Sequence, residues 1–196
     1  MRGLPERAVT LRQLARAAVP GPPGMEPGLY AAHFFEAPKM TYPYGTHVAG
    51  VEVDPATGRV TLRKYVVTYD VGRAINPMIV GGQIVGGLAQ GLGGALFEEL
   101  VYDDQGQPLT TTFMDYLVPT AMEMPEATIV KILEETPTPL NPLGVKGVGE
   151  GGSSGAGAAI ANAVADALAP LGIAITELPL SPDRLARLVR ERDARS

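Results

Sequence analysis

A glycine-rich loop, Asn141–Gly152, contains the residue best suited to chemistry. It places one carboxylate, Glu150, just before an alanine-rich segment that is expected to be helical. Glycine lacks a Cβ, so backbone on both sides of Glu150 can approach a ligand closely. A helix start also offers free N–H groups and a positive dipole end. This setting predicts that Glu150 is a base acting on a bound ligand, with its carboxylate facing a cleft rather than bulk solvent. The alternative is that it caps the helix or faces water.

The same loop matches the dinucleotide-binding pattern G-x-G-x-x-G at Gly147, Gly149 and Gly152. That pattern binds a pyrophosphate only when a buried strand leads directly into it. Here the preceding residues 136–142 are rich in proline. Proline lacks the N–H that a central strand needs. The sequence therefore argues against a Rossmann-type site.

Composition limits the chemistry further. The net charge is −5, so a nucleic-acid role has no electrostatic support. The chain has no cysteine, which excludes disulfides, thiolate catalysis and iron–sulfur clusters ligated within it. Its two histidines, His33 and His47, lack metal-ligand spacing, so we expect no metal held by protein ligands. No hydrophobic signal sequence opens the chain, and we expect a cytoplasmic protein.

The elements that position Glu150 follow from the residue patterns. We expect residues 1–29 to form a loosely packed N-terminal segment, with a short helix over 9–18. In the remaining residues, 30–196, two β-prone runs at 46–54 and 59–70 flank a Pro-Ala-Thr-Gly turn. Two such runs joined by a short turn predict a β-hairpin.

A long helix is predicted next, because residues 74–97 carry no charge and Asn76-Pro77 is a favourable helix start. Each glycine in it costs about 1 kcal/mol of helix propensity relative to alanine. Close approach of a neighbouring element or of a cofactor must offset that cost. A membrane-spanning helix is the alternative, but Gln83, Gln90 and the lack of flanking basic clusters favour a helix inside a protein.

The rest of the chain alternates between the two types of element. We expect a turn at 102–107, a strand at 127–134 and a helix of small residues at 152–171. A short β-prone segment at 173–178 and an amphipathic helix from Ser181 follow. Together these predict an α+β fold, with a mixed sheet and β-hairpins packed against the long glycine-rich helix and the second small-residue helix.

The order of sequence blocks resembles the C-terminal part of the molybdenum-binding large subunit of the xanthine oxidase family. That family includes xanthine dehydrogenases, aldehyde oxidoreductases and aerobic carbon monoxide dehydrogenases. The resemblance identifies residues 30–196 as the C-terminal portion of a molybdenum-cofactor-binding domain. The blocks that carry it are Asp70–Pro77, Gly82–Gly93, Glu98–Glu99, Thr112–Pro119 and Asn141–Gly151.

The resemblance implies a site with a molybdenum ion on a pterin dithiolene, where the glutamate of a K-x-V-G-E loop acts as the base. That glutamate falls on Glu150. The family's Q-G-x-G glutamine, which contacts the pterin, falls on Gln90. From the residues alone, Gln90 is equally well explained as a helix-packing amide. The residues implied to approach the cofactor from the side of the base are Lys146, Gly147, Val148 and Gly149.

The resemblance also implies a reaction and partners. The reaction is oxidative hydroxylation of an aldehyde, an N-heterocycle or a similar small substrate, with water as the oxygen source. The implied cofactor is the molybdenum–pterin cofactor in its cytosine dinucleotide form, with iron–sulfur clusters and FAD on partner subunits. Expected partners are the N-terminal part of the molybdenum subunit, the iron–sulfur subunit and the flavin subunit.

Large subunits of this family are several times longer than this chain, and their upstream segments shape the substrate pocket. We therefore expect the isolated chain to be inactive and, in the absence of partners, either to expose a large apolar face or to self-associate. It is then a fragment or one piece of a split subunit. The alternative is a non-catalytic remnant or subunit-interaction domain of the same fold.

Overall fold

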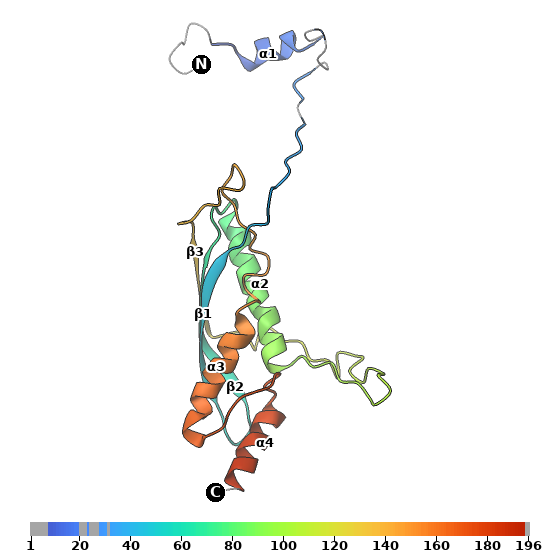
Figure 1. Cartoon of the computed structure of the whole chain (residues 1–196), viewed down its shortest axis with the longest axis vertical. Helices are drawn as coiled ribbons and strands as arrows, with labels where there is room; N and C mark the ends of the chain where they lie inside the picture. The colour runs from blue at the N-terminus through green and yellow to red at the C-terminus, as the bar shows by residue number, and fades with distance from the viewer. Residues whose placement is uncertain (1–7, 20–22, 24–27, 31, 195–196) are drawn as a thin grey trace. The chain divides into compact units, whose positions relative to one another are not determined.

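The structure, a computed structural model, describes residues 8–19, 23, 28–30 and 32–194. It divides into two compact units, Met1–Pro38 and Lys39–Ser196. The sheet and the long helices belong to the second unit (Figure 1).

The first unit contains one short helix, α1 (Leu11–Ala17), among its described residues. Its start is a capping box. The Thr10 hydroxyl accepts a hydrogen bond from the Gln13 N–H, and the Gln13 side chain accepts one from the Thr10 N–H. Two of the free N–H groups at the helix start are satisfied in this way. The predicted short helix at 9–18 is confirmed.

The sheet of the second unit has the strand order β1–β2–β3. β1 (Tyr44–Val53) and β2 (Val60–Asp70) pair antiparallel, which confirms the predicted hairpin. β3 (Ala127–Leu133), also predicted, pairs parallel with β2. Parallel neighbours need a long crossover between them. As a result, the C-terminal ends of β2 and β3 meet at one edge, where Asp70 pairs with Leu133.

A β-bulge sets which side chains of β2 face the core. The register shifts at Arg63, so that this residue has no partner on β1. Leu62 before the shift is buried, and Tyr65, Val67 and Tyr69 after it are buried in alternation. These inward side chains form the floor on which the helices pack.

The crossover is the predicted glycine-rich helix, α2 (Pro77–Leu96). The Asn76 side chain accepts hydrogen bonds from the N–H groups of Met78 and Ile79, so it is the expected N-cap. By length and composition alone, α2 could cross a membrane. One face of it is nevertheless buried inside the protein at four-residue spacing, as in an amphipathic core helix. The residues of that face are Val80, Ile84, Leu88 and Leu92.

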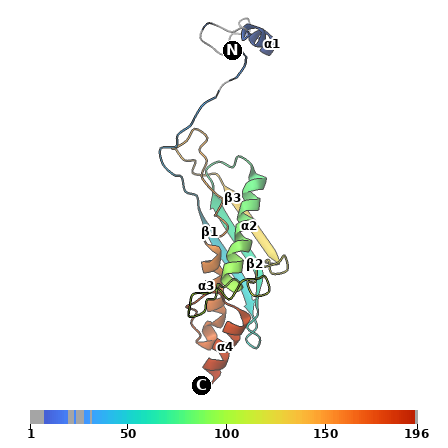
Figure 2. The same ribbon diagram turned by 90° about the vertical axis from the view of Figure 1, so that its right-hand side faces the viewer.

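The second helix, α3 (Ala156–Leu168), lies beside α2 on the same face of the sheet (Figures 1 and 2). It continues into a 3₁₀ turn, Ala169–Leu171. We expected the helix to begin at Gly152, but residues 149–155 form turns instead. The N–H groups of Ser153 and Ser154 both bond to the Glu150 carbonyl and close a single turn that does not continue into α3. At this turn the Gly152 backbone packs directly against α2.

The segment 173–178 was predicted to be β-prone, and this was wrong because it forms no strand. Its Ile173 is buried in the core instead, so its apolar side chains serve packing rather than sheet pairing. The final helix, α4 (Pro182–Asp193), is confirmed, with Ser181 as its N-cap. The α+β fold class is therefore confirmed, with one hairpin and one parallel strand in the sheet.

Between α2 and β3, residues 98–126 include an arm that projects from the body (Figure 1). Tyr102 and Pro108 form an antiparallel bridge around the predicted turn. Large apolar side chains on an exposed segment usually mark a contact surface. Those exposed on this segment include Leu100, Leu109, Phe113, Met114, Leu117 and Met122.

Candidate functional site

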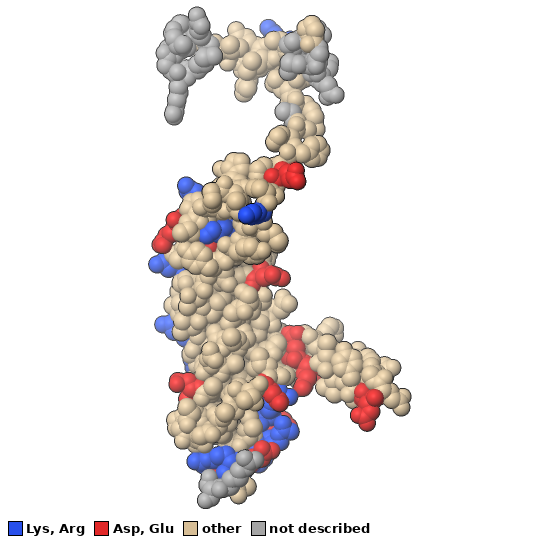
Figure 3. Space-filling view, viewed as in Figure 1, with Lys and Arg blue, Asp and Glu red and all other residues tan. Residues whose placement is uncertain are grey.

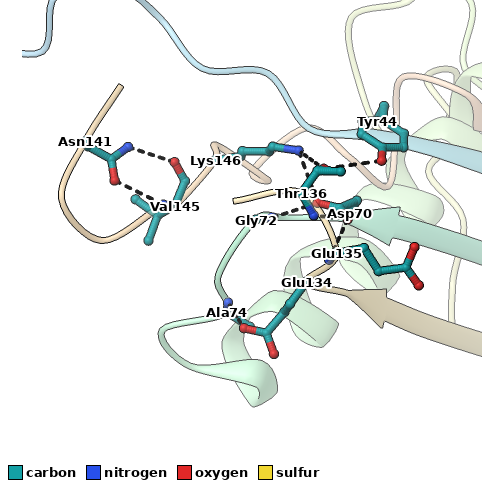
Figure 4. Close-up of polar contacts among 10 residues, drawn as sticks. All are labelled: Tyr44, Asp70, Gly72, Ala74, Glu134, Glu135, Thr136, Asn141, Val145 and Lys146. Atoms are coloured by element: carbon teal, nitrogen blue, oxygen red, sulfur yellow. Dashed lines mark hydrogen bonds and ion pairs between the residues drawn. The ribbon is translucent and has the colours of Figure 1, made fainter. Parts of the chain in front are cut away.

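A buried carboxylate sits where β2 and β3 end. Asp70 is 1% exposed. Its oxygens accept hydrogen bonds from the N–H groups of Gly72 at 3.0 Å, Glu135 at 2.9 Å and Thr136 at 3.1 Å. The Lys146 ammonium lies 3.1 Å away (Figure 4). Burial alone would raise the pKa of Asp70, but these donors hold its pKa well below the usual range. The group therefore remains ionised.

Lys146 ties the glycine-rich loop to that carboxylate. Its Nζ donates to Asp70 and, at 2.7 Å, to the Thr136 hydroxyl. The same ammonium lies 4.8 Å from the centre of the Tyr44 ring, a cation–π distance. Its backbone N–H donates to the Val71 carbonyl at 3.0 Å. The resemblance implied Lys146 beside the cofactor, but its ammonium is committed to Asp70, so its evident role is to anchor the loop.

The chain before Lys146 closes on itself. The Asn141 side chain bonds to both backbone groups of Val145, donating at 2.9 Å and accepting at 3.1 Å (Figure 4). Gly72 has a φ of +72°, and a Cβ there would lie 2.2 Å from the Gly144 carbonyl oxygen. Only glycine fits that conformation at that distance. The loop is therefore in backbone contact with the turn after β2.

Glu150 occupies the tight turn that leads into α3. Its carbonyl accepts hydrogen bonds from the N–H groups of Ser153 and Ser154, each at 3.1 Å. Its carboxylate makes no hydrogen bond or ion pair with any residue that the structure describes. The predicted loop position before a helix is confirmed. Glu150 is exposed, however, where we expected its carboxylate to face a cleft. The neighbouring glycines have no side chains that could shield it from solvent.

On one side, the backbone of this turn touches α2 directly. A Cβ on Gly152 would lie 2.0 Å from the Ile84 carbonyl oxygen, and one on Gly87 would lie 2.8 Å from the Gly152 Cα. A Cβ on Gly91 would lie 2.5 Å from the Ala156 side chain. These contacts explain why α2 has glycine at positions 87 and 91, because any side chain there would keep the turn from approaching so closely.

On the other side, the hairpin holds the same turn. His47 of β1 lies with Nε2 3.0 Å from the Gly151 carbonyl oxygen and Nδ1 2.7 Å from the Tyr65 hydroxyl. The Tyr69 hydroxyl is 3.1 Å from the Ser154 hydroxyl. Burial lowers the pKa of His47, and the Gly151 carbonyl partly offsets this. The turn is thus clamped between the hairpin and α2.

Gln90 lies on α2 between the two glycines that contact this segment, Gly87 and Gly91. It is exposed and makes no hydrogen bond with a described residue, so it is not a helix-packing amide in this chain. Around it, α2 presents bare backbone: a Cβ on Gly86 or Gly94 would meet nothing within 4 Å. That Gln90 and Glu150 face the same ligand stays a prediction.

The surface over α2 and α3 carries almost no charge in the view of Figure 3. The sequence accounts for this, because residues 74–97 contain no charged side chain. Of the other residues that the family resemblance places next to the cofactor, Gly147 and Gly149 are exposed, whereas Val148 is partly buried against the core. Exposed glycine backbone next to Glu150 and along α2 forms an open, uncharged surface.

Sequence reasoning missed Asp70, His47, Tyr65 and Tyr69 as site residues. His47, Tyr65 and Tyr69 are polar and fall at inward positions in the alternation of the hairpin, whereas Asp70 is the last residue of β2 and is buried outside that alternation. A polar group at an inward position needs a partner, and here the partner is the glycine-rich loop. That signal was present in the sequence, but the partner was not.

A cavity of about 580 Å³ lies at the end of β2 away from Asp70. None of the site residues named above lines it. Its lining includes Arg59, Leu62, Leu96, Met122 and Leu180, which belong to the hairpin, the end of α2, the projecting segment and the approach to α4. The chemistry expected at Glu150 is therefore separate from this cavity.

Comparison with known proteins decides the family. Residues 2–125 match the molybdopterin cofactor-binding domain. The chain belongs to this family. The resemblance to the molybdenum-binding subunits of the xanthine oxidase family is confirmed. The loop with Glu150 lies beyond the matched residues, but inside the alignments with individual relatives that cover most of the chain.

Two relatives and one solved structure are similar to this molybdopterin cofactor-binding domain. The 6-hydroxypseudooxynicotine dehydrogenase complex subunit gamma of Paenarthrobacter nicotinovorans is 45% identical over 160 residues, covering 82% of this chain and 20% of that protein. The carbon monoxide dehydrogenase large chain of Afipia carboxidovorans is 39% identical over 186 residues, covering 94% and 23%. A crystal structure of Cu,Mo-CO dehydrogenase superposes with a TM-score of 0.87 at 37% identity, covering 100% and 24%. The domain thus spans about a fifth to a quarter of their length.

Proposed function

We propose that this chain is the C-terminal molybdenum-cofactor-binding part of a molybdenum hydroxylase and that Glu150 is its catalytic base. The observation that carries the proposal is the free carboxylate of Glu150 on a turn that is clamped on both sides. A general base needs a fixed position and a carboxylate without a competing partner. The family membership supports the choice of a molybdenum cofactor over other ligands.

The residues around Glu150 fit a large, flat and polar-edged group. The outer face of α2 has glycines over which a Cβ would meet nothing within 4 Å, so a planar ligand can lie on the backbone. The exposed Gln90 amide has both donor and acceptor groups without partners among the described residues, as the edge of a pterin requires. Gly147 and Gly149 offer bare backbone on the side of the base. We assign these residues to holding the cofactor, together with the backbone at Val148 and Lys146.

When bound, the cofactor supplies a metal centre that takes two electrons from the substrate in a hydroxylation with water as the oxygen source. Glu150 accepts, at a carboxylate oxygen, the proton that the water-derived nucleophile gives up. Gln90 orients the pterin by hydrogen bonds from its amide. Lys146 keeps the loop in place through Asp70 and takes no part in proton transfer. We propose an aldehyde, an N-heterocycle or a similar small molecule as the substrate.

We propose that the rest of the pterin site and the substrate pocket lie on the N-terminal part of the molybdenum subunit. Iron–sulfur clusters and FAD are then on partner subunits, the cofactor is the cytosine dinucleotide form, and the complex is cytoplasmic. The apolar side chains on residues 98–126 support a contact with such partners. The name of one relative, subunit gamma of a dehydrogenase complex, points the same way.

The test is Glu150→Gln in the complex assembled by co-expression with these partners. Gln keeps the size and polarity of the side chain but removes the base. Molybdenum content should be unchanged, and turnover with an aldehyde or an N-heterocycle and an artificial electron acceptor should fall about 10²–10⁴-fold. The matched control is Glu191→Gln, an exposed glutamate on α4. Full turnover in the Glu150 variant would show that this residue is structural.

The isolated chain gives a second test of the same proposal. We expect it to hold no molybdenum and to show no turnover, because the remaining pterin contacts are proposed to lie on the partner. Size-exclusion chromatography with light scattering should detect self-association through the exposed apolar segment. A monomer that carries molybdenum and turns over substrate unaided would contradict the assignment of the missing contacts to a partner.

A further inference from the structure

The contacts of His47 determine its tautomer. The Gly151 carbonyl oxygen, 3.0 Å from Nε2, can only accept a hydrogen bond, so Nε2 carries the proton and donates it. In the neutral ring Nδ1 is then an acceptor. It receives the Tyr65 hydroxyl at 2.7 Å. Tyr65 is fully buried, and burial raises the pKa of its phenol, so the hydroxyl keeps the proton that it donates.

The His47 ring is packed on three sides. A Cβ on Gly155 would lie 2.6 Å from the His47 Cδ2, so the start of α3 rests on the ring. Tyr65 and Tyr69 meet it edge-on, with centroids 5.8 and 5.6 Å away. The groups that contact the ring are two tyrosines of β2 and the backbone at Gly151 and Gly155, and no charged side chain contacts it in the part of the chain that the structure describes.

We propose that His47, fixed as the Nε2–H tautomer by the Gly151 carbonyl and held at Nδ1 by the Tyr65 hydroxyl, is the positioning residue of the Glu150 turn. Its bond fixes the carbonyl of the residue that directly follows Glu150. A fixed Gly151 carbonyl fixes the backbone on which the Glu150 side chain is mounted, although His47 does not touch the carboxylate. The inference rests on the proposed role of Glu150 as the base, because only then does the orientation of this side chain set a rate.

The hold on the turn is tested on the 196-residue chain without any cofactor. Nitrogen-15 spectra of the imidazole should show the neutral Nε2–H tautomer at neutral pH, and the Nδ1–H tautomer would overturn the proposal. Amide exchange at Ser153 and Ser154, whose N–H groups close the turn on the Glu150 carbonyl, should accelerate about five- to tenfold in His47→Ala. In His47→Gln, which retains a donor and an acceptor, exchange should stay within about twofold of wild type.

Unchanged exchange in His47→Ala would also overturn the proposal. If that variant does not fold, Tyr65→Phe takes its place. It leaves the ring but removes the hydroxyl that donates to Nδ1, so both the nitrogen-15 shift of Nδ1 and the exchange at Ser153 should change. An unaltered pattern would contradict the role of Tyr65. His33→Ala is the matched control, because His33 belongs to the other unit, is exposed and makes no hydrogen bond, ion pair or ring contact with a described residue.

In the assembled enzyme, His47→Ala should lower kcat about five- to tenfold with little change in KM, because a misplaced base slows the chemical step alone. His47→Gln should restore most of the loss. Equal activity of the Ala variant would refute the positioning role. If Glu150→Gln keeps full turnover, the proposed function fails, while the tautomer and exchange data still decide whether His47 holds the turn.

Discussion

The glycine-rich loop is fixed at two points by opposite means. At Lys146 it is held by charge, through a buried ion pair with Asp70 and three backbone donors to the same carboxylate. At Gly151 it is held by neutral groups, through His47 and through backbone contact with α2. Glu150 lies beside the neutral point. A cation close to a carboxylate makes it a weaker base. This difference gives a reason for the position of the ionic anchor at Lys146. There the ammonium is paired with Asp70 and not with Glu150.

Asp70→Asn should break the ionic anchor with the largest effect. The substitution keeps the shape but leaves the Lys146 ammonium without its counter-charge in a site where both side chains are nearly inaccessible. Breaking one half of a buried pair costs about 3–5 kcal/mol. Urea unfolding of the chain should show a loss in this range. Asp166→Asn, at an exposed position on α3, is the control and should be near neutral. A decrease in the free energy of unfolding below about 1 kcal/mol would mean that the Asp70–Lys146 pair contributes no more than an ordinary surface ion pair.

Gly152→Ala should break the neutral point by steric overlap. Its Cβ would lie 2.0 Å from the Ile84 carbonyl oxygen, which is helix backbone and does not move easily. Overpacking of this kind costs about 1–3 kcal/mol. The unfolding midpoint should fall, and amide exchange should rise in residues 150–155 but not around Asp70. If exchange rose equally at both points, the two anchors would not be independent.

Gly86→Ala should increase the free energy of unfolding, in contrast to the two substitutions above. A Cβ at this exposed position of α2 meets nothing within 4 Å, so only the backbone entropy changes. Replacing glycine by alanine in a helix then stabilises by about 0.5–1 kcal/mol. If this face receives the cofactor, the same variant should carry less molybdenum in the assembled enzyme. A variant that is destabilised would contradict the structure, and one with full molybdenum content would move the cofactor off this face.

A change of pH should have a smaller effect on stability, and it should affect the two anchors in different pH ranges. Burial lowers the pKa of His47, so the unfolded chain binds this proton more readily than the folded one. Stability should therefore be complete above the unfolded pKa of about 6.5 and decline as the pH falls below it. Asp70, whose folded pKa is also depressed, should lose its contribution only below about pH 4.

Denaturant unfolding at a series of pH values measures both windows. In His47→Gln the decline near neutral pH should disappear, while the acid loss remains. Asp70→Asn should reduce the acid loss, to which the lowered pKa values of Asp54 and Glu123 also contribute, and should keep the decline due to His47. A wild-type profile without any decline around the His47 window would contradict the burial of a neutral imidazole.

Local patterns in the sequence were enough for most elements. Asn76-Pro77 marked the start of α2, the Pro-Ala-Thr-Gly turn marked the hairpin, and Ser181 marked α4. The delayed start of α3 was not predictable in this way, because it depends on Gly152 meeting α2.

The site, too, was predictable only where the pattern is local. The glycines around Glu150 identified this residue from the sequence, but the contacts that hold its turn in place could not be predicted. His47 is 104 residues from Gly151, and Asp70 is 76 residues from Lys146. Such pairs form only when the chain has folded, so composition and spacing along the chain carry no record of them. The irregular path of residues 173–178 is a similar case, since Ile173 has the same apolar character in a strand or in a core.

The parallel pairing of β2 with β3 has a consequence for the order of folding. The hairpin closes across a short turn, but β3 joins only after the whole of α2 and the segment 98–126 have been made and looped back. Pairings of such high contact order form slowly. Two donors to Asp70, the N–H groups of Glu135 and Thr136, come from just after β3. We therefore expect a hairpin nucleus early in synthesis, with the Glu150 turn ordered later, once β3 and the residues after it have been made.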